Sequence, residues 1–276
     1  MNSHDAPTTA SLRALAVRIA EEAGRQVRDG RPDVVQVAAT KSSVVDVVTQ
    51  ADADSEALIR RIIVTERPDD GILGEEDAYV AGRTGLTWVV DPIDGTVNYV
   101  YDVASYAVSV AVVEGGPDPL TWTARAGAVH DVTTGQTWSA GAGEGAFLDG
   151  SPIRCAEPRP LGESLVGTGF GYDAARRASQ ARVLATVLPQ VRDIRRLGSA
   201  AVDLCLVAQG RLDAYYERGL NPWDLAAGAL VAQEAGAVVV GLRGARADAS
   251  MTVAGPAATV ADLGLILEGV DADSDA

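Results

Sequence analysis

Apolar residues recur at helical spacing in the first seventy positions. Within residues 11–28, the positions that share one helix face are Leu12, Leu15, Ala16, Ile19 and Ala23. A short apolar run, residues 44–49, precedes a second amphipathic stretch, in which Thr49 predicts the N-cap and Pro68 the end. We therefore expect two helices before the first strand.

The middle of the chain is built from short apolar runs that Gly and Asp interrupt. The runs that predict strands are 71–77, 86–91, 105–116, 124–131, 135–143 and 145–153. Asp149 and Gly150 form a hairpin-type turn signal inside the last of them. Successive strands with such short connections indicate an antiparallel meander.

Helices and strands alternate in the second half of the chain. Strands are predicted at 163–170, 212–217, 237–242 and 250–255, and helices at 175–190, 198–210, 221–236 and 257–269. This order favours an α+β fold arranged as a layered sandwich. We expect a single domain with two halves, 10–155 and 156–268, and flexible tails at 1–9 and 269–276.

Composition narrows the classes of function. A formal net charge of −15 over 276 residues argues against non-specific binding to nucleic acid, which requires clustered Lys and Arg. The sequence shows no signal-peptide pattern and no apolar stretch long enough to span a membrane, so we expect no membrane partner. Cys155 and Cys205 cannot build a disulfide framework, which favours a reducing cytoplasm. His4 and His130 are the only histidines, and His130 is expected at the surface or in a hairpin, so the sequence offers few residues for a zinc site or for histidine catalysis.

The segment "WVVDPIDGTVNY" runs from an apolar strand directly into two acids. Asp91 ends the strand, Asp94 follows the turn at Pro92, and Gly95 permits a close backbone approach. Thr96 begins a short segment whose free N–H groups could bind an anion. Two carboxylates, the Ile93 carbonyl and this turn suit magnesium and phosphate, although a plain turn after a strand would explain the same residues.

Two further acids have simple structural explanations when each is taken alone. "GEED" closes the preceding strand, and Glu75 or Glu76 would reach the edge where Asp91 lies if the two strands are neighbours. It could equally belong to an exposed acidic loop. Asp224 in "NPWDLAAG" falls in the first turn of a predicted helix, where the helix dipole favours an acid in any protein.

Taken together, "GEED", "WVVDPIDGTVNYV" and "WDLAAGALVAQEAGAVV" resemble the signature of the inositol monophosphatase family. The resemblance includes "KSSVVDVVTQAD" and "GSAAVDLCLVAQGRLDAYYERG", and so covers nearly the whole chain. It implies a layered α-β-α-β-α sandwich, a homodimer and a magnesium-dependent phosphomonoesterase. The implied reaction is hydrolysis of inositol 1-phosphate to inositol and phosphate, by in-line attack of a metal-activated water and without a phosphoenzyme.

The resemblance also implies a metal site. Glu75, Asp91 and the Ile93 carbonyl would hold one Mg²⁺, and Asp91, Asp94 and Asp224 a second. Relatives bind a third, weaker ion near the residue that matches Glu75. Metals about 3.5–4 Å apart can clamp both the attacking and the leaving oxygen of an in-line displacement.

Roles around the substrate follow from the same resemblance. The Thr96 hydroxyl would orient the water, with Glu75 and Asp46 as proton acceptors, and the N–H groups of Gly95 and Thr96 would hold the phosphate. The substrate contacts implied are Asp94, Gly95, Thr96, Ser199, Ala200, Glu217 and Asp224. Lys41 and Asp46 fall in the family's N-terminal hairpin, where Lys41 could be a solvated loop residue. Asp52 is interpreted as a helix-capping acid.

The sequence leaves other enzyme classes, other substrates and a non-catalytic role open. Haloacid dehalogenase-type phosphatases carry Asp-x-Asp-Gly-Thr, but one extra residue separates Asp91 from Asp94 here. Relatives also hydrolyse histidinol phosphate, fructose 1,6-bisphosphate or 3′-phosphoadenosine nucleotides, whereas the run 97–99 resembles the inositol type. A non-catalytic regulatory or scaffolding relative is a further alternative, which the complete set of acids disfavours. Asp102 departs from the family pattern at the expected rim of the site.

Overall fold

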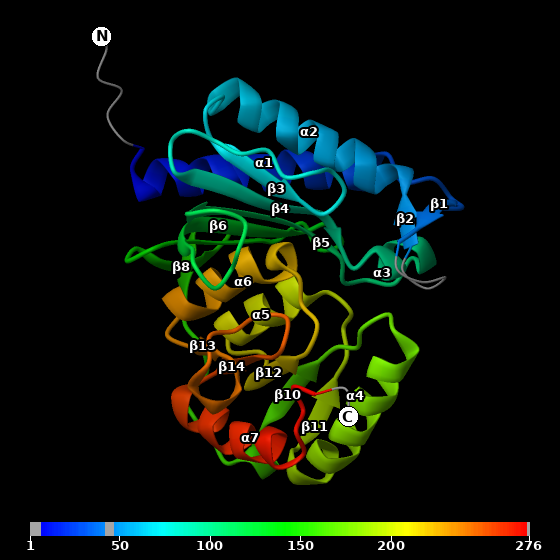
Figure 1. Ribbon diagram of the computed structural model, residues 1–276, viewed down its shortest axis with the longest axis vertical. Helices are drawn as coiled ribbons and strands as arrows, with labels where there is room; N and C mark the ends of the chain where they lie inside the picture. The colour runs from blue at the N-terminus through cyan, green and yellow to red at the C-terminus, as the bar shows by residue number, and fades with distance from the viewer. Residues whose placement is uncertain (1–6, 42–46, 275–276) are drawn as a thin grey trace.

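The computed structural model describes residues 7–41 and 47–274 and shows five stacked layers (Figure 1). The outermost layer on one side holds α1 (Thr9–Asp29) and α2 (Gln50–Glu66). Thr49 caps α2, which ends before Pro68, so both predicted ends of this helix are confirmed. A small hairpin of β1 (Val37–Thr40) and β2 (Val47–Thr49) joins the two helices.

The second layer is a seven-stranded sheet in the order β3-β4-β5-β6-β7-β8-β9. Its strands are β3 (Gly71–Gly74), β4 (Leu86–Asp94), β5 (Ala107–Glu114), β6 (Thr123–Asp131), β7 (Thr137–Gly141), β8 (Gly145–Leu148) and β9 (Ser151–Ile153). β3 and β4 are parallel and all later pairs antiparallel, which confirms the predicted meander. Asp149 and Gly150 both adopt positive φ in the β8–β9 turn, as a tight hairpin requires.

A five-stranded sheet in the order β11-β10-β12-β14-β13 forms the fourth layer. Its strands are β10 (Leu165–Thr168), β11 (Asp193–Arg195), β12 (Ala214–Glu217), β13 (Val238–Val240) and β14 (Thr252–Gly255). The remaining helices are α3 (Thr96–Tyr101), α4 (Ala174–Val187), α5 (Ala200–Ala208), α6 (Pro222–Glu234) and α7 (Ala257–Gly269), with 3₁₀ turns at Leu161–Glu163, Leu188–Gln190 and Leu242–Gly244. β11 is a strand that the sequence pattern did not predict.

Three buried apolar clusters hold the layers together. One joins α1 and α2 to the first sheet, the second surrounds α5 and α6 between the sheets, and the third joins the second sheet to α4 and α7. Trp88 and Val90 of β4 belong to the first cluster and Val89 to the second, because successive strand residues face opposite sides of a sheet. The predicted α-β-α-β-α sandwich is therefore confirmed.

His130 and part of the C-terminal tail are buried in the fold. His130 lies in the β6–β7 hairpin, which is one of the two expected positions, but it is buried rather than at the surface, and a Cβ at Gly24 of α1 would lie 2.2 Å from its ring. In the described part of the C-terminal tail, Ala272 is buried and Arg243 forms ion pairs with Asp271 and Asp273. None of the helices in residues 7–41 and 47–274 has the length and apolar character of a membrane span.

Candidate active site

The end of β4 carries the first two acids. Asp91 pairs with Ser109 of β5 in register, whereas Asp94 pairs with Ala107, so a bulge lies between the two acids. The bulge redirects the backbone, and the Asp91 carboxylate accepts a hydrogen bond from the Ile93 N–H at 3.0 Å. Gly95 then adopts a φ of +99°, a conformation that favours glycine, and α3 begins at Thr96.

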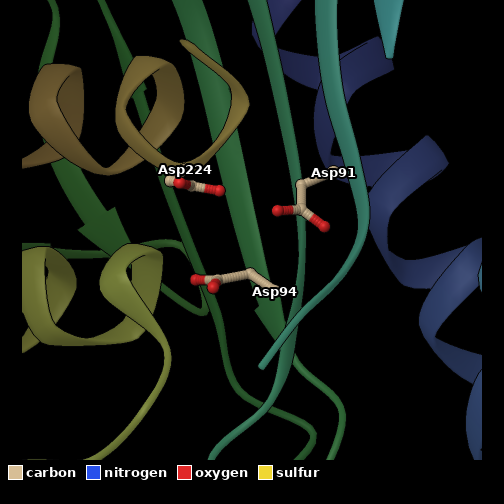
Figure 2. Close-up of side chains that lie close together, drawn as sticks. All are labelled: Asp91, Asp94 and Asp224. Carbon is tan, nitrogen blue, oxygen red and sulfur yellow. The ribbon is translucent and has the colours of Figure 1, made fainter. Parts of the chain in front are cut away.

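The third acid comes from the layer between the sheets. Asp224 lies in the first turn of α6, where it accepts a hydrogen bond from the N–H of the N-cap, Asn221, at 2.7 Å. The capping role expected from the sequence is therefore present. The same side chain also faces the end of β4 (Figure 2), and ligand oxygens of Asp91, Asp94 and Asp224 all lie within 4.8 Å of one another.

Burial and mutual repulsion dominate the electrostatics of these three carboxylates. Burial raises the pKa of Asp91 and of Asp224 well above the usual range, and the charges of the neighbouring acids raise both further. Burial also raises the pKa of Asp94 to about 6, although hydrogen bonds from Ser199 and from backbone N–H groups of α5 oppose the shift. Two buried carboxylates and a half-buried one at this spacing can all be ionised only beside positive charge.

Glu75 lies next to this group, at the end of β3. Its carboxylate accepts a hydrogen bond from Lys41 Nζ at 2.8 Å, and Lys41 also reaches Glu76 at 2.7 Å. Burial raises the pKa of Glu75 to about 7 against the opposing charge of Lys41. Glu75 and Asp91 line the same cavity, and the charge of Glu75 raises the pKa of Asp91. Lys41 is thus an exposed residue after β1 whose ammonium group nevertheless pairs with Glu75 at the site.

Thr96 connects the acidic group to a residue that sequence reasoning missed. Its hydroxyl lies 3.0 Å from the Ile93 carbonyl and 3.1 Å from Asp52 Oδ1. Asp52 is buried, and its other oxygen caps α2 by accepting hydrogen bonds from the N–H and hydroxyl of Thr49. The cap interpretation of Asp52 is thus confirmed but incomplete: a capping acid uses one oxygen and leaves the second free. Asp46, the predicted proton acceptor, lies outside the described residues.

Of the predicted substrate contacts in the second half of the chain, Ser199 binds another site residue, whereas Ala200 and Glu217 line the cavity. Ser199, the N-cap of α5, donates its hydroxyl to Asp94 Oδ2 at 2.7 Å, and the Ala201 N–H donates to the same oxygen at 2.7 Å. Ser199 therefore holds Asp94 in place. Ala200 and Glu217 line the open space in front of the acids, and burial raises the pKa of Glu217 to about 7.

A single cavity of about 590 Å³ contains these groups. The acids and turn residues that line it are Glu75, Asp91, Ile93, Asp94, Gly95, Thr96, Asp173, Glu217 and Asp224, and the cations are Lys41, Arg176 and Arg196. Asp102 does not line the cavity: it ends α3 with a positive φ and forms an ion pair with Arg31. A predominantly acidic cavity with hard oxygen donors suits divalent cations that bind an anionic substrate.

Comparisons with known proteins agree with this geometry. The model of the inositol monophosphatase family matches residues 9–269. "Inositol-1-monophosphatase SuhB" of Mycobacterium tuberculosis is 45% identical over 271 residues, covering 92% of this chain and 91% of that protein. The solved structure of Mycobacterium tuberculosis SuhB, at 44% identity, covers 98% of this chain and all of its own with a TM-score of 0.81.

A more distant relative bears a different name. "Nus factor SuhB" of Vibrio cholerae is 34% identical over 232 residues, covering 83% of this chain and 85% of that protein. The match to the family model nevertheless spans both sheets and every acid of the cavity. The chain therefore belongs to the inositol monophosphatase family.

Proposed function

We propose that this phosphatase hydrolyses inositol 1-phosphate with bound Mg²⁺. The observation that carries the proposal is the group of three carboxylates, the buried Asp91 and Asp94 and the half-buried Asp224, within 4.8 Å of one another. The names of the mycobacterial relatives support inositol 1-phosphate as the substrate.

The donor set fits magnesium. Carboxylate oxygens are the ligands that this cation prefers, and the raised pKa of each buried acid indicates a deficit of positive charge around them. Asp91, Asp94 and Asp224 would hold one ion, and Glu75, Asp91 and the Ile93 carbonyl another. When bound, magnesium neutralises phosphoryl charge and lowers the pKa of a coordinated water.

The chain's own residues supply orientation and proton transfer. The Thr96 hydroxyl, fixed beside the Ile93 carbonyl, would direct a water toward the phosphorus atom. Asp52 would accept the proton through Thr96, because its Oδ1 lies 3.1 Å from the Thr96 hydroxyl. The proton-accepting roles of Glu75 and Asp46 stay predictions, as does the contact of the Gly95 and Thr96 N–H groups with phosphate.

Two further residues that line the cavity would recognise the substrate. Glu217 presents a carboxylate that can accept hydrogen bonds from sugar hydroxyls, and Ala200 also lines the cavity. Ser199 would act indirectly, through Asp94. A homodimer remains part of the proposal, and analytical ultracentrifugation at micromolar concentration would test it.

Phosphate release tests the proposed function. We would compare inositol 1-phosphate, histidinol phosphate, fructose 1,6-bisphosphate and 3′-phosphoadenosine 5′-phosphate, each with Mg²⁺ and with chelator. We expect magnesium-dependent turnover, fastest on inositol 1-phosphate, that Asp94→Asn abolishes. The matched control is Asp102→Asn, an exposed acid outside the cavity. Preference for another ester would overturn the substrate, and a chain that acts only as a regulatory protein would release no phosphate from any ester.

A further inference from the structure

Three consecutive residues of β12, Tyr215, Tyr216 and Glu217, lead from a buried tyrosine to the substrate cavity. Tyr215 and Glu217 share one face of the strand, while Tyr216 faces the other side. Accordingly, Tyr215 belongs to the apolar cluster between the sheets and Tyr216 to the cluster beneath the second sheet. Tyr215 is fully buried, and its hydroxyl donates a hydrogen bond to Glu217 Oε2 at 2.5 Å.

Gly169 packs against the same carboxylate. A Cβ at this position would lie 1.9 Å from Glu217 Oε2 and 2.4 Å from Oε1. The carboxyl group of Glu217 therefore lies directly against the glycine, where no side chain could fit. With Tyr215 bonded to one oxygen and Gly169 behind both, Glu217 has little freedom to turn.

Tyr215 is suited to act only as a donor. Burial raises the pKa of its hydroxyl well above the usual value, and the charges of Glu217 and the buried Asp203 raise it further. The phenol consequently keeps its proton at neutral pH. At pH 8, above the pKa of about 7 for Glu217, the ionised carboxylate accepts a charge-assisted hydrogen bond from the phenol.

We propose that Tyr215 is a positioning residue for substrate selection: its hydroxyl occupies Oε2 of Glu217, so that Oε1 is presented to a hydroxyl group of the substrate. The inference rests on the proposed function, because it assigns Glu217 to the polyol part of a phosphate ester. Esters without hydroxyl groups should not depend on Tyr215, since they make no bond with Glu217.

The test is Tyr215→Phe, assayed at pH 8 in saturating Mg²⁺ on inositol 1-phosphate and on phenyl phosphate, which lacks hydroxyl groups. We expect the KM for inositol 1-phosphate to rise about tenfold, as for a lost hydrogen bond to a charged group, with kcat within about twofold. The constants for phenyl phosphate should stay unchanged. Tyr216→Phe is the matched control, because it removes the same hydroxyl from the other face of the strand.

A double-mutant cycle separates positioning from a general structural effect. In a Glu217→Ala background, Tyr215→Phe should raise the KM no further. Gly169→Ala, which displaces Glu217 from its other side, should raise the same KM and supplies the test should Tyr215→Phe fail to fold. An unchanged KM, or an equal change for both esters, would overturn the inference. Absence of magnesium-dependent hydrolysis of either ester by the wild type would instead refute the proposed function.

Discussion

Asp52→Asn separates two tasks of one buried side chain. One oxygen of Asp52 accepts hydrogen bonds from the N–H and hydroxyl of Thr49 at 2.8 and 2.6 Å, and the other lies 3.1 Å from the Thr96 hydroxyl. Asparagine keeps the size, and its amide oxygen can still accept the hydrogen bonds from Thr49. Its NH₂ group would then face Thr96, from which it can take no proton.

The two tasks predict effects of different kinds. Charge-assisted hydrogen bonds become neutral ones of roughly half the strength, so the free energy of unfolding should fall by about 1–2 kcal/mol. A domain stable by roughly 5–15 kcal/mol stays folded after such a loss, so weaker capping alone leaves kcat unchanged. Loss of a general base should lower kcat by about 10²–10⁴-fold.

Steady-state hydrolysis of inositol 1-phosphate in excess Mg²⁺, with urea unfolding of the same preparations, measures both effects. Asp54→Asn is the matched control on the same helix, because Asp54 is exposed and accepts a hydrogen bond only from the Gln50 side chain, at 2.9 Å, among the bonds described. It should change neither quantity. A kcat for Asp52→Asn within about threefold of wild type, with lowered stability, would show that Asp52 is a cap alone.

Three further predictions concern stability. Gly24→Ala places a Cβ 2.2 Å from the buried His130 ring, so the free energy of unfolding in urea should fall by about 1–2 kcal/mol, because overpacking exceeds the helix-propensity gain. Gly264→Ala, where a Cβ meets open space, should instead raise it by up to about 1 kcal/mol. Equal gains would contradict this. Mg²⁺ at about 100 times its Kd should add about 2.7 kcal/mol in thermal unfolding of the wild type, and Asp91→Asn should lose that gain; stabilisation retained in the variant would remove Asp91 from the metal site. Burial lowers the pKa of His130, so the unfolded chain binds more protons than the folded chain below about pH 6.5. The contribution of His130 to stability should therefore be complete above that pH and decline below it. A His130→Gln variant with the same decline would show that His130 is not its cause.

Local rules account for the elements that could be predicted. The ends of α2 followed from a capping residue and a proline, and the β8–β9 turn from Asp149-Gly150, since each signal acts within a few residues. β11 has only three residues at a sheet edge, too few for a periodic pattern. The hairpin position of His130 followed from the local pattern, but its burial did not, because its ring packs against a glycine of α1 more than a hundred residues earlier in the chain.

The sequence by itself determined which acids end a strand or begin a helix, and the family to which their order belongs. The resemblance implied that Asp224 meets Asp91, which the structure shows, but only the tertiary structure decided that Lys41 pairs with Glu75 and that Asp52 reaches Thr96. Periodicity specifies which side of an element is buried, but it does not specify which distant segment fills the other side of the layer. The site forms between layers, so its contacts arise only when the sheets and helices pack together.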